Sequence, residues 1–376
     1  MEQINVFSGD RVISRIVVEK GIEGLEACLV PYRHVFAVMD SNVAMSPAAA
    51  IMAEMMNRKG VPGKLVTVSE DTKTMDTVMD ICGWLLDNGA DRDALVLAVG
   101  GGITSDMVGF AASIYKRGVK YANVPTTLLS QVDAAIGGKT GVNFERYKNM
   151  LGVIRQPEFT YVCPQVLETL PHREFTAGVA EMLKTFVIED GGNYQKAVDV
   201  LSEMHQGYSI LPEESAADYW ADCISAYSDE LTYLIAEAVR VKASIVSRDQ
   251  YERGERRKLN LGHTFAHAVE TLAQRSGEDI SHGEAVAMGM VLAARLSDRV
   301  FRGDMDTPTA MEGGMAIDLF DCGLTRICPF GIEDMAEIMK KDKKAEEGRI
   351  HFILIHEIGD VVSYDLTVED VCCLLA

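Results

Sequence analysis

The chain has 376 residues, which is enough for about two domains with cores of their own. Its hydrophobic content of 48% and charged content of 24% are those of an ordinary globular protein, and its net charge of −20 argues against general binding to nucleic acid or anionic membranes. Met1 leads directly into polar sequence, and no apolar run approaches the roughly 18–20 residues of a membrane span. With eight cysteines in no CxxC or framework spacing, we expect a cytoplasmic protein with reduced thiols.

The first half of the chain alternates strand and helix signals. Strands followed by helices of 10–15 residues predict parallel β-α-β units and a doubly wound sheet. Ser46 as N-cap, Pro47 in the first turn and Gly60 as a stop predict one such helix. Strands are expected at 34–40, 64–70, 94–102 and 119–125, with further helices ending near Asn88 and opened by Ser105 and Asp106.

Long amphipathic patterns dominate after about residue 170. They include AGVAEMLKTFVIED, a stretch around 215–247, LNLGHTFAHAVETLAQ and HGEAVAMGMVLAARLSDRV, with a strand candidate near 351–359. The sequence therefore predicts an N-terminal α/β nucleotide-binding domain with a parallel sheet, 1–168, and a mainly α-helical C-terminal domain, 169–376.

Three consecutive glycines, at 100, 101 and 102, separate a predicted strand from the helix that follows. Glycine lets the backbone approach a pyrophosphate closely, and a helix N-terminus offers free N–H groups and a favourable dipole. The spacing is not the GxGxxG of the Rossmann fingerprint, so a tight turn that binds nothing is an alternative interpretation. Asp40, at the end of another strand, could take ribose hydroxyls or merely cap a helix.

The segment RGERRKLNLGHTFAHAVETLAQ carries polar residues at spacings of +4, +3 and +4. On a single helix those spacings would put all of them on one face. A lone buried histidine is usually a core residue, but two histidines on one polar stripe among apolar neighbours predict a metal or catalytic site. The residues of the stripe are Arg256, Asn260, His263 and His267.

Two further residues could complete a metal site: Glu181 in an otherwise apolar helix, and His282 at the start of another. Zinc takes imidazole and carboxylate ligands, and a catalytic site keeps about three protein ligands and an open position. A set of one glutamate and two histidines would leave room for two substrate oxygens. His263 and His267 could instead both be ligands, although the absence of an HExxH glutamate argues against a metalloprotease.

Basic residues recur in the same segments. In a chain of net charge −20, cations beside possible metal ligands indicate a pocket for a phosphorylated or carboxylated substrate, although each alone could be a surface charge. They are Arg117, Lys139, Lys184, Lys242, Arg253, Arg256 and the run DKK at 342–344.

Several ordered segments resemble the dehydroquinate synthase family of sugar-phosphate cyclases over nearly the whole chain. They are VGGGITSDMVGFAASIYKRG, VPTTLLSQVDAAIGGKTGVN, KNMLG, LPHREFTAGVAEMLK, LNLGHTFAHAVE, HGEAVAMGM and DKK. The resemblance implies NAD, a zinc or cobalt ion and a homodimer. The sequence departs from the family pattern locally, with Phe144 where many members have histidine and Ala266 in place of a glycine.

The resemblance also assigns residues to three tasks. It implies that the metal ligands are Glu181, His263 and His282. It implies that NAD is held by Asp40, Asn42, Glu70, Lys73, Gly101, Gly102, Asp106, Thr126 and Thr127. It implies that the substrate is bound by Arg117, Asp133, Lys139, Asn149, Lys184, Lys242, Glu252, Arg256, Asn260, His267 and one or both of Lys343 and Lys344.

The implied reaction is the conversion of 3-deoxy-D-arabino-heptulosonate 7-phosphate to 3-dehydroquinate and phosphate, a lyase step of the shikimate pathway for aromatic amino acids. NAD would oxidise the C5 hydroxyl transiently while the metal stabilises the alkoxide. His267 is a candidate proton shuttle, because histidine ordinarily titrates near neutral pH.

Three alternative functions remain. They are another cyclase, such as a 2-epi-5-epi-valiolone synthase acting on sedoheptulose 7-phosphate, a metal-dependent polyol dehydrogenase, and a non-catalytic NAD-binding scaffold. Asn149, Asn260 and His267 together favour the dehydroquinate reaction. The basic residues and GGKTGVN argue against the polyol dehydrogenase, because a simple alcohol needs no anion site.

Overall fold

The computed structural model describes residues 2–145, 147–209, 213–303, 310–324, 327–340 and 349–375. The chain divides into two compact units that are interleaved in sequence: Met1–Phe175 with Glu213–Tyr251, and Thr176–Pro212 with Glu252–Ala376. Helices α7 (Glu213–Ala226) and α8 (Ser228–Arg248) belong to the first unit, where α8 packs on the first strand. The predicted domains 1–168 and 169–376 stay a prediction.

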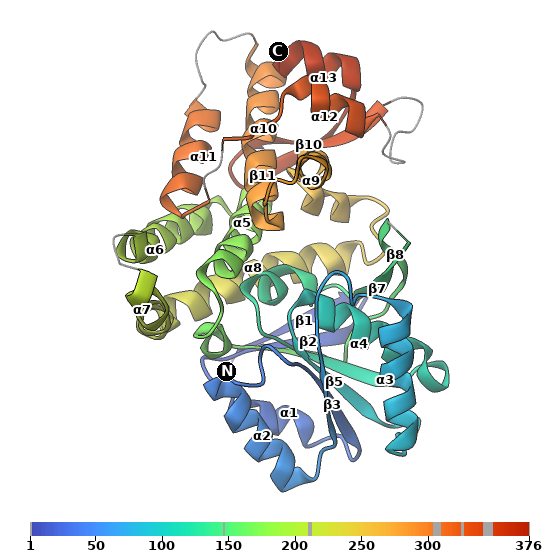
Figure 1. The fold of residues 1–376 in the computed structure, drawn as a ribbon. Coiled ribbons are helices and arrows are strands. Elements are labelled where there is room, and N and C mark those ends of the chain that lie inside the picture. The colour runs from blue at the N-terminus through green and yellow to red at the C-terminus, as the bar shows by residue number, and fades with distance from the viewer. Residues whose placement is uncertain are drawn as a thin grey trace. The chain divides into compact units, whose positions relative to one another are not determined.

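A mixed sheet forms the centre of the first unit (Figure 1). Among the described residues its seven strands lie in the order β1-β2-β9-β6-β5-β3-β4, and only β1 runs antiparallel to its neighbour. The strands are β1 (Glu2–Ser8), β2 (Arg11–Val18), β3 (Val35–Asp40), β4 (Gly63–Val66), β5 (Leu95–Gly100), β6 (Lys120–Pro125) and β9 (Phe159–Val162). The predicted parallel sheet is confirmed, and the β1–β2 hairpin and β9 are additions that the sequence patterns did not indicate.

Helices cover both faces of this sheet. Because β-α-β crossovers are right-handed and the chain reverses direction after β4, α2 (Pro47–Lys59) lies on the opposite face from α3 (Met75–Asp87) and α4 (Gly102–Ile114). The predicted cap of α2 is confirmed, since Ser46 Oγ accepts a hydrogen bond from Ala49 N at 3.1 Å and Gly60 ends the helix at φ 63°. The short helix α1 (Leu25–Leu29) precedes β3.

The first unit also contains a separate hairpin of β7 (Lys139–Phe144) and β8 (Tyr147–Ile154), which packs on α4. Gly141 and Gly152 face each other across it, and a Cβ on Gly152 would lie 2.1 Å from the Thr140 carbonyl oxygen. The KTGVN segment is therefore a tightly paired strand. Three short helical turns complete the unit: η1 (Tyr115–Arg117), η2 (Ser130–Ala134) and η3 (Pro164–Leu167).

The second unit is mainly helical, as the sequence predicted. Its elements are α5 (His172–Glu189, whose first turn belongs to the first unit), α6 (Gly191–Ser209), η4 (Glu255–Asn260), α9 (His263–Ser276), α10 (His282–Arg302), α11 (Ala310–Asp321), α12 (Ile332–Met339), α13 (Val368–Leu375) and the hairpin β10 (Arg349–Glu357)–β11 (Asp360–Thr367). Helix α10 contacts α9, α11, α13 and β10, so it forms the core of the unit. None of the described helices combines the length and the apolar character that crossing a membrane requires.

Candidate metal centre and nucleotide-binding edge

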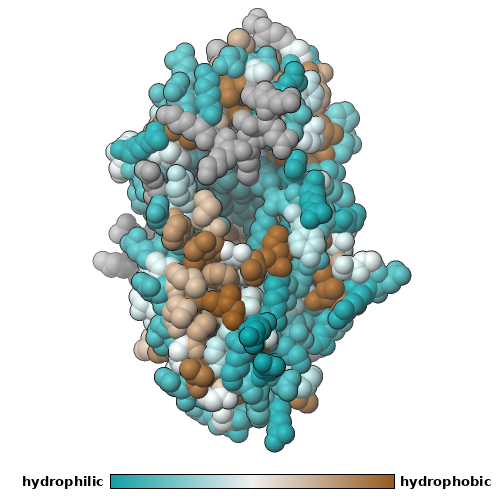
Figure 2. All heavy atoms as spheres, turned by 90° about the vertical axis from the view of Figure 1, so that its right-hand side faces the viewer, coloured by the Kyte–Doolittle hydropathy of each residue, from teal (hydrophilic) through white to brown (hydrophobic). Residues whose placement is uncertain are grey.

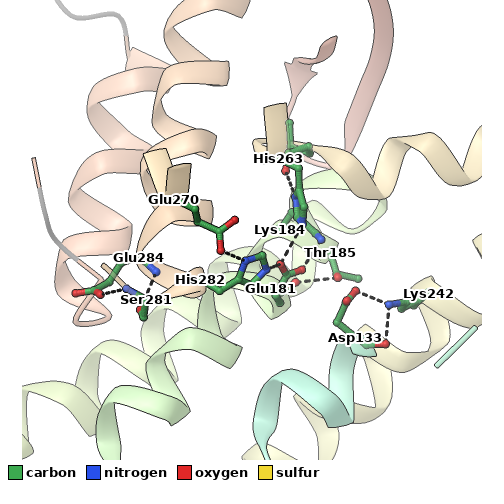
Figure 3. A network of polar contacts seen from close by, with 11 residues as sticks. Asp133, Glu181, Lys184, Thr185, Lys242, His263, Glu270, Ser281, His282 and Glu284 are labelled. Atoms are coloured by element: carbon green, nitrogen blue, oxygen red, sulfur yellow. Dashed lines mark hydrogen bonds and ion pairs between the residues drawn. The ribbon is translucent and has the colours of Figure 1, made fainter. Parts of the chain in front are cut away.

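Glu181, His263 and His282 converge in the second unit from three different helices, α5, α9 and α10 (Figure 3). Their possible ligand atoms all lie within 4.8 Å of one another. The Nε2 atoms of His263 and His282 lie 3.6 and 3.4 Å from the same oxygen, Glu181 Oε1. Metal–ligand bonds of about 2.0–2.2 Å place neighbouring ligands of a tetrahedral ion roughly 3.3–3.6 Å apart, so the described side chains fit a zinc-like ion.

The outward-facing nitrogens of both imidazoles have partners. His263 Nδ1 lies 3.1 Å from the Leu261 carbonyl oxygen, and His282 Nδ1 lies 3.3 Å from Glu270 Oε1. A histidine that binds a metal through Nε2 usually donates its Nδ1–H to such a carbonyl or carboxylate, which fixes the tautomer and orients the ring. Glu270 was not predicted from the sequence, although it stands in the same helix, seven residues after His263.

The ionisation states of these side chains favour binding of a cation, because the carboxyl of Glu181 is ionised and the imidazole of His263 is neutral. Burial favours the neutral form of the Glu181 carboxyl, but the ammonium of Lys184 and the two imidazoles outweigh burial and hold its pKa well below the ordinary value. Burial and the Lys184 charge lower the pKa of His263 to about 3, so this imidazole is neutral. Burial opposes the charge on His282, but the carboxylates of Glu181 and Glu270 raise its pKa. An ion bound to His282 would therefore displace a proton.

The single helical stripe predicted for 253–274 is wrong in its geometry. Arg256 and Asn260 lie in the 3₁₀ turn η4, and α9 begins only at His263. Gly262 lies between η4 and α9 at φ 74°, a left-handed conformation that prevents one continuous helix. One part of the prediction is confirmed: His263 and His267 lie one turn apart on α9, with ring centroids separated by 5.7 Å.

Two glycines of HGEAVAMGM bring α10 close to the other ligand-bearing elements. A Cβ on Gly283, next to His282, would lie 2.2 Å from the Cα of Ala177, one turn before Glu181 on α5. A Cβ on Gly289 would lie 2.2 Å from the carbonyl oxygen of Gly262, next to His263. The contacts are possible only without side chains, so these glycines set the spacing of the three ligands.

Among the other predicted residues of the second unit, Asn260 and Glu252 are hydrogen-bonded to each other. Asn260 Nδ2 donates to Glu252 Oε1 at 2.8 Å, and Glu252 adopts a left-handed φ of 57°. Arg256 is buried, with 2% of its surface exposed, as is Lys184 with 1%. The lysines of the DKK run, Lys343 and Lys344, lie outside the described residues.

In the first unit, the residues predicted to hold NAD lie at the carboxyl ends of four adjacent parallel strands. Asp40 ends β3 and Asn42 follows it, Glu70 and Lys73 follow β4, Gly101, Gly102 and Asp106 follow β5, and Thr126 and Thr127 follow β6. The chain goes from β3 to β4 on one side and then to β5 on the other, so β3 and β5 flank a topological switch point. Doubly wound sheets bind nucleotides at this place.

The glycine turn at the end of β5 begins α4 three residues earlier than predicted, at Gly102. It also has a packing reason, because a Cβ on Gly102 would lie 2.9 Å from that of Ala134, and one on Gly101 would lie 3.1 Å from Thr127. Of the two alternatives that the sequence left open for Asp40, the helix cap is wrong, because the helix that follows, α2, is capped by Ser46. Asp40 Oδ1 accepts a hydrogen bond from Asn42 N at 2.9 Å, and burial raises its pKa.

A buried lysine joins two of the predicted sets. Lys73 Nζ donates to Asp106 Oδ2 at 2.6 Å and to Asn149 Oδ1 at 2.5 Å, and only 4% of Lys73 is exposed. Burial raises the pKa of Asp106 to about 6, although the charge of Lys73 opposes this. Asn149 has a left-handed φ of 53°. Strained backbone of this kind gathers at functional sites.

The remaining predicted residues of the first unit are the pair Lys242 and Asp133 and two further cations, Lys139 and Arg117. Lys242 Nζ, on α8, contacts the side chain of Asp133 and donates to its carbonyl oxygen at 2.7 Å (Figure 3). Lys139 is close enough to Asp106 for its charge to lower the pKa of that carboxyl. Arg117 has a left-handed φ of 70°, and no hydrogen bond or ion pair to another described residue joins it to these groups.

Comparison with known proteins agrees with this architecture. A 2-epi-5-epi-valiolone synthase from Streptomyces hygroscopicus, solved with NAD+ and Zn2+, superimposes with a TM-score of 0.78 at 28% identity, covering 97% of this chain and 96% of its own. A 2-deoxy-scyllo-inosose synthase, solved with carbaglucose-6-phosphate, NAD+ and Co2+, gives 0.78 at 23% identity, covering 100% and 99%. The fold and the site define a protein of the sugar-phosphate cyclase class.

Sequence relatives give the family within that class. The family models for 3-dehydroquinate synthase match in order, the N-terminal one over 64–177 and the C-terminal one over 178–345. A 3-dehydroquinate synthase of Acidithiobacillus ferrooxidans is 40% identical over 79% of this chain and 75% of its own. One of Solibacter usitatus is 36% identical over 92% and 90%. The chain belongs to the 3-dehydroquinate synthase family.

Proposed function

We propose that this chain converts 3-deoxy-D-arabino-heptulosonate 7-phosphate to 3-dehydroquinate and phosphate, as its family name implies. The observation that carries the proposal is the cluster of Glu181, His263 and His282, formed within a chain that matches the family from residue 64 to residue 345. The chemistry begins with the oxidation of a secondary alcohol. That step needs a hydride acceptor and a way to stabilise an alkoxide.

The residues present fit both groups. The three ligands would hold a zinc or cobalt ion, which supplies Lewis-acid stabilisation of an alkoxide. The carboxyl edge of β3–β6 would hold NAD, which supplies a reversible oxidation. The first turn of α4 offers N–H groups to a pyrophosphate there, and Asp40 offers acceptors to ribose hydroxyls.

The chain's own side chains would bind the anionic substrate and move protons. Lys184, Lys242 and Arg256 are buried cations, at most 4% exposed, and the family resemblance places them in the substrate pocket. We assign them, with Arg117, Asp133, Lys139, Asn149, Glu252, Asn260 and His267, to substrate binding. His267, one helical turn from His263, would transfer the proton of the reacting hydroxyl.

A sugar-phosphate substrate is tested by measuring phosphate release. Heptulosonate 7-phosphate and sedoheptulose 7-phosphate are offered separately, with and without a chelator. Turnover of the first sugar alone, lost with chelator and restored by Zn2+ or Co2+, is the expected result. Turnover of sedoheptulose 7-phosphate alone would instead assign the chain to the valiolone synthases, to one of which it is 28% identical.

Three finer properties complete the proposal: a homodimer, a cytoplasmic location and a zinc or cobalt ion. Apolar side chains of β8 are exposed, among them Tyr147, Met150 and Val153 at 44%, 47% and 39%, and could support self-association. Figure 2 looks at the side where Figure 1 places α3 and β8, and it shows hydrophobic residues gathered there. Light scattering of the purified protein tests the dimer, and elemental analysis tests the metal.

A further inference from the structure

Asn143, the asparagine of GVN, connects two parts of the first unit. Its Oδ1 accepts a hydrogen bond from Asn149 N at 2.9 Å. Its Nδ2 donates to Glu70 Oε2 at 2.8 Å and to the Glu70 carbonyl oxygen at 3.2 Å. Its backbone N–H donates to the Lys73 carbonyl oxygen at 2.9 Å. One residue of β7 therefore ties the loop after β4 to β8.

Asn149 depends on this connection for its conformation. A residue other than glycine at a left-handed φ, here 53°, persists only where its surroundings hold it. Two bonds hold Asn149: its backbone N–H is bound by Asn143, and its side-chain oxygen by Lys73 at 2.5 Å. Both bonds lead to the segment that contains Glu70 and Lys73.

We propose that Asn143 is a positioning residue that couples NAD binding to substrate binding. The inference rests on the proposed function, in which Glu70 and Lys73 hold NAD and Asn149 holds the sugar phosphate. When NAD orders Glu70 and Lys73, the bonds through Asn143 stabilise the left-handed Asn149, so each ligand raises the affinity for the other by the same factor.

The chemistry of the position requires an amide. Asn143 accepts a hydrogen bond from one neighbour and donates two to the other, and a carboxylate of the same shape can only accept. The variant Asn143→Asp would keep the bond to Asn149 but place a second carboxylate against Glu70. Two adjacent carboxylates take up a proton as the pH falls, so the defect should be pH-dependent.

The test measures NAD binding by calorimetry with the full-length protein at pH 8 and pH 6. We expect Asn143→Asp to weaken binding about tenfold relative to wild type at pH 8, since a hydrogen bond to a charged group is lost, and less at pH 6. The double variant Asn143→Asp/Glu70→Gln should recover part of the loss at pH 8, because the glutamine amide can donate to the new carboxylate. Leu86→Ala, an exposed change on α3 of the same unit, is the control and should bind NAD as wild type does.

Steady-state kinetics test the coupling itself. In the wild type, KM for heptulosonate 7-phosphate should fall as NAD rises from limiting to saturating, and in Asn143→Asp the ratio of the two KM values should approach one. If Asn143→Asp keeps the wild-type ratio of KM values and the wild-type NAD affinity at both pH values, this inference is overturned and the proposed function is not affected. A wild-type protein that neither binds NAD nor releases phosphate would overturn the proposed function, and this inference with it.

Discussion

Replacing Glu270 by glutamine should weaken metal binding about tenfold without unfolding the protein. Glu270 Oε1 lies 3.3 Å from Nδ1 of His282, whose other nitrogen lies 3.4 Å from Glu181. Glutamine keeps the shape and an acceptor oxygen but loses the negative charge that makes the imidazole a stronger ligand. Leucine also removes the acceptor. Loss of such an outer partner typically costs about 10–100-fold in metal affinity, so we expect Glu270→Leu near the upper end of that range.

The assay is a competition between metal-free protein and a chromophoric chelator for Zn2+. Glu278→Gln, which neutralises an exposed carboxylate two residues after α9 ends, is the control for the change in net charge and should leave the affinity unchanged. Circular dichroism checks that each variant is folded. The reasoning is refuted if Glu270→Gln binds Zn2+ within about twofold of wild type while His282→Ala, which removes a ligand, does not bind.

Further changes test other parts of the site. Gly289→Ala should cost about 1–3 kcal/mol of stability and weaken metal binding, because its Cβ would lie 2.2 Å from a backbone oxygen. The control Gly314→Ala, which has open space around it, should change neither property. Thermal melting measures the stability, and the zinc competition measures the metal affinity. Lys184→Met should destabilise the metal-free protein by about 3–5 kcal/mol, because the buried carboxylate of Glu181 loses its neighbouring positive charge. Added Zn2+ should raise the melting temperature of this variant by more than it raises that of the wild type. Because its carboxylate partners raise the pKa of His282, that ring is protonated at neutral pH when no metal is bound. Zn2+ binding should therefore release a proton, which calorimetry in two buffers of different ionisation enthalpy detects. The affinity for Zn2+ should rise with pH.

Local signals in the sequence were sufficient for several elements of the first unit, although not for the β1–β2 hairpin or β9. Ser46, Pro47 and Gly60 act through their own backbone and side chain within one or two turns, so the bounds of α2 could be predicted from them. The strands β3, β5 and β6 are buried apolar runs next to such signals. The carboxyl edge of the sheet, and with it the position of Asp40 and the glycines, follows from the order of these elements.

The metal cluster needed information that no local pattern contains. The spacing of His263 and His267 indicated a site, but the left-handed Gly262 that interrupts the helix has its reason in a distant contact with Gly289. Glu270 is one carboxylate among many until the fold brings it to His282. The roles of Asn149 and the other substrate residues came from the family resemblance and stay predictions.

Burial explains why several charged residues of the resemblance occur as pairs. Three lysines that are at most 4% exposed each contact a carboxylate: Lys73 with Asp106, Lys184 with Glu181 and Lys242 with Asp133. Removing either member of such a pair leaves an uncompensated charge away from water, which costs more than the pair contributes. Stability therefore constrains these positions together with function. A variant of one member alone will mix the two effects, and a double-mutant cycle over each pair is needed to separate ligand binding from the cost of an orphaned charge.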